Sequence, residues 1–365
     1  MNYPVVILYS RRVPTIKGLP VEFLANIFKL TAPLTEKSSF LRKKAKYYLD
    51  RNSYSTLSYV NDWLEAFYRL LPNAIKAINI SNFADLMRYR KSVEKAELVI
   101  IMHSAFGDNL SVINILRDLI SYRSGKLILF VGNEYGDMSN KFDFINFVEP
   151  EFLASQLPKK SANWLYSNCK FGKVILAPPA LNELKFRNLN YARNIDLGFR
   201  GDRYPPLVGD DRRNKIIDLV QELTPKLNMS KDIKFSRVDA DKWVLFLNRW
   251  HGTIGGEAGT VNLNRPTDMN SAPVIVSGKA ISSRHFEAIG TNTCQILIEG
   301  EYNGILVPDK HYIAVRRDFS NLSAVLEKFK DQKYRSSIAE CAYSLAIENH
   351  TYSKRVSNIL GEAGF

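Results

Sequence analysis

The stretch 282–290 carries the residue types most suited to chemistry. Within it, Ser283 can cap the start of a helix, and Gly290 suits a left-handed helix end. The free amides and partial positive charge of a helix start attract phosphate, and Arg284 would add a two-pronged cation in the first turn. Glu287, one turn further on, is placed to accept two hydrogen bonds from neighbouring hydroxyls. The pattern fits a diphosphate joined to a ribose, and it also fits an ordinary amphipathic helix with solvated side chains.

Short β-branched runs alternate with helical patterns along most of the chain. The expected strands are 5–8, 98–102, 126–131, 174–177, 195–199, 243–247 and 294–298, and the expected helices are 19–30, 112–122, 213–223, 284–289 and two that close the chain. This alternation predicts parallel sheets with helices on both faces. A polar, basic stretch at 183–194 divides the chain into two halves. We therefore predict an α/β protein with two doubly wound, Rossmann-like domains facing a cleft, with ligands at the carboxyl ends of the strands.

Composition narrows the classes of partner. The 365 residues include 50 Lys and Arg against 37 Asp and Glu, a formal charge of +13 that favours nucleic acid, anionic lipid or phosphate-bearing small molecules. The densest basic cluster is Arg42, Lys43, Lys44 and Lys46, embedded among aromatic and apolar residues. It fits peripheral contact with an anionic membrane or a solvated helix face. We expect no nucleic-acid partner, because no zinc-finger spacing, aromatic RNA-binding signature or repeat accompanies the charge.

The sequence shows no targeting signal and no cysteine motif. No run of 18 apolar residues occurs, and the first residues lack the pattern of a signal peptide. Cys169, Cys294 and Cys341 are odd in number and widely spaced, so neither a disulfide framework nor a cysteine zinc site is expected. We expect a cytoplasmic protein that its basic cluster could hold at the inner face of a membrane.

The segment 284–290, Arg-His-Phe-Glu-Ala-Ile-Gly, resembles the R-x-F-E-A-x-G element of GT-B glycosyltransferases of the spore-maturation-protein-like group, relatives of family 4. The end of the chain, His350-Thr351-Tyr352 with Arg355, is similar to the HTYxxR tail of that group. Upstream, the segment 195–201 followed by Arg212-Arg213 resembles the first strand of the nucleotide-binding half. The resemblance covers about residues 195–360. The first half matches in architecture alone.

The resemblance implies a hexosyltransferase-like enzyme that moves a sugar from a nucleotide-sugar donor to an acceptor hydroxyl. By matching positions, Glu287 would bind the ribose hydroxyls, and Arg284 with the helix-start amides and Ser283 would face the diphosphate. Arg200 and Arg203, after the first strand of that half, are further candidates for the phosphate charge. Fixed cations of this kind lower the barrier by meeting the negative charge that grows on the leaving group.

One position departs from the pattern. Many family 4 enzymes carry a second Glu eight positions before the ribose Glu, where this chain has Lys279. A carboxylate that grips the donor is absent at that position, and Lys279 could serve a phosphate instead. Nearby, the glycine-rich stretch 251–259 is expected to follow a strand at 243–247. There Glu257 could bind hydroxyls, or the stretch could be a plain surface loop.

In the first half, candidates follow the expected strands. His103 comes after the strand 98–102, at a place comparable to a family histidine near the transferred sugar, and it could bind a sugar hydroxyl or cap a backbone group. Asp108 could act as base on the acceptor if the reaction inverts configuration. Glu134 and Asp137 are alternative bases or parts of a plain turn. Gly18, after the first strand, could approach the cleft.

The resemblance also sets the expected organisation. Residues 1–190 would form the acceptor-side domain, 191–340 the nucleotide-sugar-binding domain, and 341–365 a helix that crosses back to the first. The expected partners are the donor and a glycan, lipid-linked or protein acceptor, with a role in polysaccharide or glycoconjugate synthesis. No cofactor or metal is expected. A sugar-nucleotide epimerase on the same fold and a non-catalytic protein that binds anionic lipid or glycan remain the alternatives.

Overall fold

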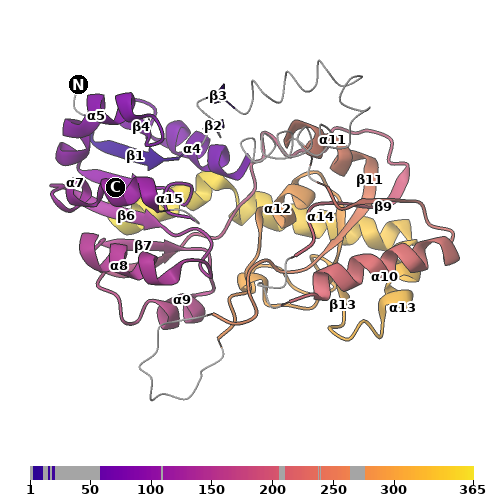
Figure 1. Ribbon diagram of the computed structural model, residues 1–365. Coiled ribbons are helices and arrows are strands. Elements are labelled where there is room, and N and C mark those ends of the chain that lie inside the picture. The colour runs from indigo at the N-terminus through magenta and orange to yellow at the C-terminus, as the bar shows by residue number, and fades with distance from the viewer. Residues whose placement is uncertain are drawn as a thin grey trace, which may run out of the picture.

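The computed structural model describes residues 3–10, 15–16, 19–20, 58–107, 110–204, 210–236, 238, 240–263 and 276–365. Two parallel sheets dominate this part of the chain, and each has helices on both faces (Figure 1). A pair of very short antiparallel strands, β2 (Thr15–Ile16) and β3 (Leu19–Pro20), stands apart from them. The predicted α/β class with two doubly wound sheets is confirmed.

The N-terminal sheet runs in the order β4-β1-β5-β6-β7-β8, with every pair parallel. Its strands are β1 (Val5–Tyr9), β4 (Ile75–Asn79), β5 (Leu98–Ile101), β6 (Lys126–Phe130), β7 (Phe152–Ser155) and β8 (Lys173–Leu176). The helices are α4 (Ser58–Leu70), α5 (Phe83–Lys95), α6 (Ser111–Ile115), α7 (Arg117–Ser121), α8 (Met138–Val148) and α9 (Lys159–Leu165). All four residues of β5 are buried, as expected of a strand covered on both faces.

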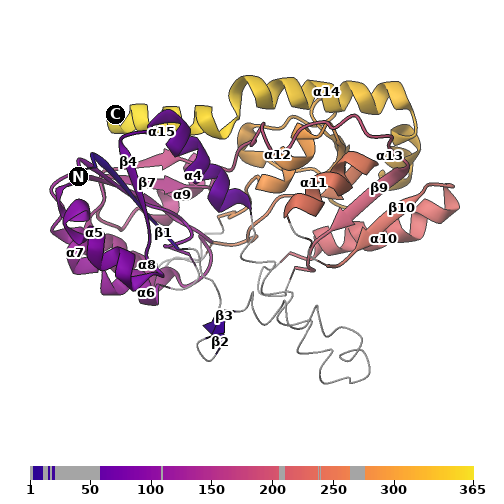
Figure 2. The ribbon, with the colours of Figure 1, turned by 90° about the horizontal axis from the view of Figure 1, so that it is seen from above.

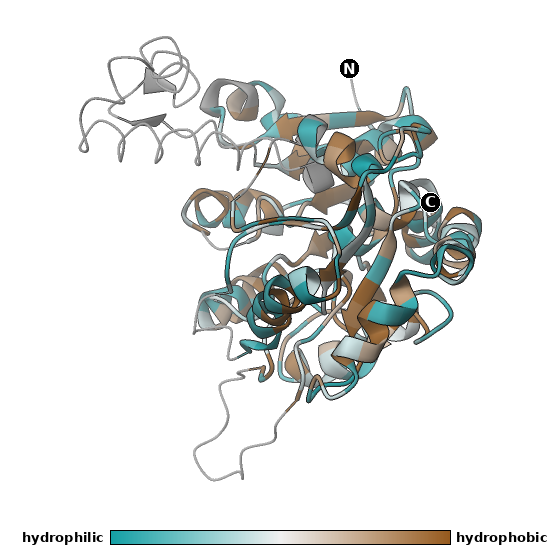
Figure 3. Ribbon diagram, turned by 90° about the vertical axis from the view of Figure 1, so that its right-hand side faces the viewer, coloured by the Kyte–Doolittle hydropathy of each residue, from teal (hydrophilic) through white to brown (hydrophobic). Residues whose placement is uncertain are grey.

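The C-terminal sheet runs in the order β10-β9-β11-β12-β13, again all parallel. Its strands are β9 (Ile195–Arg200), β10 (Lys231–Lys234), β11 (Trp250–Gly255), β12 (Cys294–Ile298) and β13 (Ile313–Val315). Around it lie α10 (Arg212–Lys226), α11 (Ala240–Arg249), α12 (Ser283–Gly290), the short 3-10 helix η2 (Tyr302–Gly304), α13 (Leu322–Phe329) and α14 (Gln332–Asn349). Figure 3 shows the central strands as the most hydrophobic parts of the ribbon.

The last helix, α15 (Tyr352–Ala363), packs on the N-terminal sheet. Its buried face joins the apolar cluster that contains β1, β5 and α4. In Figure 2, α14 and α15 run one after the other along one side of both halves. The chain passes between the halves at His350–Tyr352, where Leu181 exchanges backbone hydrogen bonds with His350 and Tyr352 at 2.8 and 3.0 Å. The expected boundary at residue 341 therefore falls inside α14.

Two local expectations were wrong, those at 243–247 and at 19–20, and a third, the helix at 112–122, is confirmed with one break. The stretch 243–247 is part of the helix α11, and the strand follows it at β11. Trp243, Val244 and Leu247 are buried while Leu245 is 39% exposed, which is the periodicity of a helix and not of a strand. The helix expected at 112–122 breaks at Leu116 into α6 and α7. The helix expected from residue 19 is a strand at Leu19–Pro20, and residues 21–30 lie outside the described part.

Because residues 250–255 form a strand, Gly252 belongs to the sheet and not to a loop, beside Gly198 of the neighbouring strand β9. Gly252 lies inside β11, and a Cβ on it would come 2.6 Å from the ring of Phe329. Gly198 in β9 lies under Trp250, and a Cβ on it would come 1.8 Å from Cδ2 of that ring. Both glycines therefore serve close packing in the sheet. None of the described helices is long and apolar enough to span a membrane.

Candidate functional site

The helix α12 begins at the carboxyl end of the C-terminal sheet, where ligands of such sheets bind. Its N-cap is Ser282, one residue before the predicted Ser283. The backbone N–H of Ser282 donates to Nδ1 of His285 at 3.0 Å, which fixes the first turn. Gly290 is helical, and the left-handed residue is Asn292 with φ of 56°. Gly290 serves packing, because a Cβ there would lie 2.3 Å from the carbonyl oxygen of Phe186.

Glu287 is buried behind the first turn of α12, with 8% of its surface exposed. The indole Nε1 of Trp243, on α11, donates to its Oε2 at 2.7 Å. Burial raises the pKa of this carboxyl, whereas the charge of Arg284 and hydrogen bonds from Trp243 and Ser283 act in the opposite direction. Burial is the largest of these effects, so the pKa stays above its ordinary value, while Trp243 and Ser283 hold the carboxyl in place beside the cation of Arg284.

Arg284 lies in the first turn of α12 and bends over the end of β9. It donates from Nη1 to the carbonyl oxygen of Arg200. Its guanidinium carbon is 5.1 Å from the centre of the Trp243 ring and 5.7 Å from that of Phe199. Gly201, with φ of 151°, leaves room for it, since a Cβ there would be 3.0 Å from Nη1. The side chain is thus held at the crossing of β9, α11 and α12.

A second arginine lies close to Arg284. The guanidinium carbon of Arg213, on α10, stacks 3.4 Å from the centre of the Tyr204 ring. Burial lowers the pKa of Arg213, and the neighbouring charge of Arg284 lowers it further. Two like charges this close together favour a bound anion, because the anion relieves their repulsion. Arg213 was quoted from the sequence as part of the Arg212-Arg213 motif and had no assigned role.

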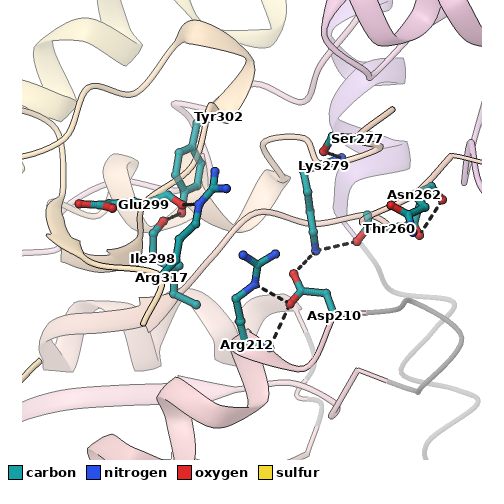
Figure 4. A network of polar contacts seen from close by, with 11 residues as sticks. Asp210, Arg212, Thr260, Asn262, Ser277, Lys279, Ile298, Glu299, Tyr302 and Arg317 are labelled. Atoms are coloured by element: carbon teal, nitrogen blue, oxygen red, sulfur yellow. Dashed lines mark hydrogen bonds and ion pairs between the residues drawn. The ribbon is translucent and has the colours of Figure 1, made fainter. Parts of the chain in front are cut away.

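Lys279 is bound to a carboxylate (Figure 4). Its Nζ forms an ion pair with Oδ2 of Asp210 at 2.6 Å and donates to the carbonyl oxygen of Gly259 at 2.9 Å. Arg212 donates to the same carboxylate at 3.0 Å. Burial pushes the pKa of Asp210 upward, but the hydrogen bonds from Lys279 and Arg212 outweigh it and hold the pKa at about 2. The lysine at the position of the missing Glu is therefore paired with an ionised carboxylate from another loop.

Three other residues predicted for the donor are engaged in contacts within the protein. Arg200 donates to both oxygens of Asp232 at 2.6 Å and is 3% exposed, so it braces β9 against β10. Arg203 forms an ion pair with Asp218 at 2.6 Å. Glu257 accepts the backbone N–H of Tyr302 at 2.7 Å and so fixes η2. Glu257 follows β11 directly, as the corrected strand position requires.

The predicted residues of the first half have different surroundings. His103 follows β5 and is 5% exposed, and burial lowers its pKa to about 4, so it is neutral at pH 7. Glu134 is buried, and its oxygens accept from Ser155 Oγ at 2.6 Å, Tyr166 Oη at 2.7 Å and the Gln156 N–H at 2.9 Å. Burial raises its pKa, and the three hydrogen bonds oppose that rise. This carboxyl joins loops of the fold and is poorly placed to act as a base.

The remaining predicted residues add little to the site. Asp137 is exposed at the start of α8, with φ of 53°, and accepts from Asn140 at 2.7 Å. Asp108, Gly18 and the basic cluster at 42–46 lie outside the described residues. Within the described ranges, no group of three or more His, Cys, Asp or Glu side chains could hold a metal ion.

A buried polar cluster behind Glu287 was missed from the sequence. Asp62, on α4, is 3% exposed and accepts from Nδ2 of Asn182 at 2.8 Å. Burial raises the pKa of Asp62 to about 7; the hydrogen bond from Asn182 opposes the rise, and the charge of Glu287 adds to it. Glu287 on α12 and Asp62 in the N-terminal half therefore interact electrostatically. No local motif marks it, because its members are up to 225 residues apart, the separation of Asp62 and Glu287 in the chain.

One surface hollow of about 350 Å³ lies at the other end of the C-terminal sheet. It is lined by Asn188, Asn190, Tyr191, Arg193, His251, Gln332, Arg335 and Ser336. Since His251 is near the amino end of β11 and α12 starts at the carboxyl end, this hollow is separate from Arg284 and Glu287.

Residues 235–361 match a protein-family model described as glycosyl transferase-like. No curated protein is significantly similar to the chain. An α-glucosyltransferase solved with UDP and a 13-mer DNA containing an HMU base aligns over 100% of both chains, at 10% identity and a TM-score of 0.56. HepE of Anabaena, solved with UDP-glucose, aligns over 98% of this chain and 99% of its own, at 8% identity and 0.53. A glycosyltransferase from Rickettsia africae aligns over 99% and 98%, at 12% identity and 0.51. These likenesses show that the chain has the GT-B fold.

Proposed function

We propose that this protein transfers a sugar, such as a hexose, from a nucleotide-sugar donor to an acceptor hydroxyl. The observation that carries the proposal is the start of α12, where Arg284 lies at the carboxyl end of the sheet and the carboxyl of Glu287 is one turn behind it. A cation at the helix start suits a diphosphate, and a supported carboxylate suits the two hydroxyls of a ribose. The family model over the same half and the UDP and UDP-glucose in two similar structures support this choice.

The reaction requires the donor side of the site to stabilise the leaving group. The bond between the anomeric carbon and the diphosphate oxygen breaks, the acceptor oxygen bonds to that carbon, and the acceptor proton passes to a base. Negative charge grows on the leaving diphosphate. Arg284, with the neighbouring charge of Arg213 and the amides of the first turn, stabilises that charge and so lowers the barrier.

The acceptor side belongs to the first half of the chain, with the division at about residue 190 and α15 returning to it. His103, neutral at pH 7, is suited to a hydrogen bond with a hydroxyl of the transferred sugar and not to charge stabilisation. The motifs at 284–290 and 350–355 support a relationship to the spore-maturation-protein-like group. They also support an acceptor in polysaccharide or glycoconjugate synthesis. Assays of candidate acceptors should include DNA beside glycans, lipid-linked sugars and proteins, because one similar structure contains DNA.

A thermal-shift panel of UDP, GDP, dTDP, ADP and CMP tests the donor class. The nucleotide of the true donor should raise the melting temperature, because a ligand that binds the folded state alone stabilises it. Glu287→Ala should abolish the shift while the protein stays folded. A shift that Glu287→Ala leaves unchanged would refute the ribose assignment. No shift with any nucleotide would count against the proposed function as a whole.

A further inference from the structure

Trp243 contacts both donor-binding side chains of α12. Its indole N–H donates to Glu287 at 2.7 Å, and the face of its ring lies 5.1 Å from the guanidinium carbon of Arg284. Trp243 is 8% exposed and comes from a different helix, α11. One planar group therefore holds a carboxylate by its edge and a cation by its face.

The packing around Trp243 fixes the orientation of its ring. Trp250 meets it edge to face, with centroids 5.5 Å apart and planes at 72°. Trp250 is fully buried and packs on Gly198 of β9, where no side chain larger than hydrogen fits. Contact with Trp250, which packs on β9, therefore fixes the ring of Trp243, and the indole N–H of Trp243 in turn fixes the carboxylate of Glu287.

An indole nitrogen can donate and cannot accept. Trp243 donates to Oε2 of Glu287, and Ser283 also hydrogen-bonds to this carboxyl, so the carboxylate plane is fixed relative to α12 and the remaining lone pairs stay available to a ligand. A carboxylate fixed in this way suits two adjacent hydroxyls better than one. Adjacent hydroxyls are what distinguishes a ribose from a 2′-deoxyribose.

We propose that Trp243 is a positioning residue that makes the donor site select ribonucleotides, by orienting Glu287 toward the ribose hydroxyls. This inference rests on the proposed function and names a determinant of its specificity. Trp243 does not touch the reacting atoms. Its effect reaches the donor through Glu287 and, by its ring face, through Arg284.

Isothermal titration calorimetry with matched ribo- and 2′-deoxyribonucleoside diphosphates tests it, with UDP and 2′-deoxy-UDP as the first pair and the ADP and GDP pairs next. The wild type should bind the ribonucleotide at least about tenfold more tightly, as expected for a hydrogen bond to a charged group. Trp243→Phe keeps a ring under Arg284 and removes the N–H. The ratio should then fall severalfold, toward one, while binding of inorganic pyrophosphate changes little.

The matched control is Trp164→Phe, the same change on α9, where the ring packs against the apolar cluster of the N-terminal half. It should leave the ratio unchanged, because a structural effect weakens both nucleotides alike. If Trp243→Phe fails to fold, benzothienylalanine at position 243 keeps the ring size and deletes the N–H alone. A ratio that stays at the wild-type value in either variant overturns the inference and leaves the proposed function standing. A wild type that binds none of these nucleotides overturns both.

Discussion

The buried carboxyl of Asp62 gives a prediction whose size follows from the structure. In the folded protein its pKa is about 7, against an ordinary value of 3.8, because burial disfavours the charged form and the charge of Glu287 adds to that effect. Between about pH 4 and pH 7 the folded state therefore holds a proton that the unfolded state has released. Stability contributed by this proton is complete below pH 4 and is lost as the pH rises through 7.

The size follows from the difference of about 3 pKa units. At about 1.36 kcal/mol for each unit, wild type should lose about 4 kcal/mol of unfolding free energy between pH 4 and pH 8 through this group alone. Asp62→Asn keeps an oxygen that can accept from Asn182 and does not titrate. The stability of Asp62→Asn relative to wild type should therefore rise with pH across this window and level off above it.

Urea unfolding at a series of pH values, followed by circular dichroism, measures the difference. Glu65, Lys185 and Glu287 also face Asp62, and because they are common to both proteins their own titration largely cancels in the comparison. Asp118→Asn, an exposed carboxyl on α7, is the control for removing a charge from the surface. A difference between Asp62→Asn and wild type that is the same at pH 4 and pH 8 would refute the reasoning.

Three further outcomes are expected. Arg284→Ala should weaken a nucleoside diphosphate by at least about tenfold and the parent nucleoside little, measured by calorimetry; equal losses would reject its phosphate role. Glu134→Gln should lower the unfolding free energy by about 1–3 kcal/mol, because three donors lose their carboxyl acceptor, and a pH–rate profile that loses its acidic limb, the limb set by a catalytic base, would contradict this structural role. Gly198→Ala should destabilise by about 2 kcal/mol or more, since its Cβ would overlap Trp250, whereas Gly361→Ala, with open space at an exposed helical position, should stabilise by about 0.5–1 kcal/mol. Equal melting temperatures for these two variants would contradict the packing argument.

Strands buried on both faces were predictable because their signal is local. The run 98–101 is continuous and apolar, and the run 294–298 is apolar apart from Gln295; both are interior strands of parallel sheets. The stretch 243–247 misled, because Trp-Val-Leu-Phe-Leu is typical of a strand by composition. Its helical stripe consists of Trp243, Val244 and Leu247, which are buried and spaced by one and three residues, while Leu245 between them is exposed.

The residues predicted for the site also divide into those that local sequence indicates and those that depend on tertiary contacts. The sequence indicates Arg284 and Glu287 together because they are three positions apart in one helix, and this spacing fixes their relative position. The engagement of Arg200 by Asp232 and of Lys279 by Asp210 depends on pairings across the sheet and between loops, which spacing in the chain does not encode. The same holds for Glu134, whose donors are the last residue of β7, the residue after β7 and the residue after α9. Residue types at strand ends indicate a site, and tertiary contacts decide which of them remain available to a ligand.

A crystal structure with the nucleoside diphosphate that gives the largest thermal shift tests the central claim most directly. We expect the ribose hydroxyls within hydrogen-bond distance of the Glu287 carboxylate, and the diphosphate against Arg284 and the first amides of α12. A nucleotide bound in another part of the molecule, with Glu287 still closed on Trp243 and out of its reach, would contradict the account.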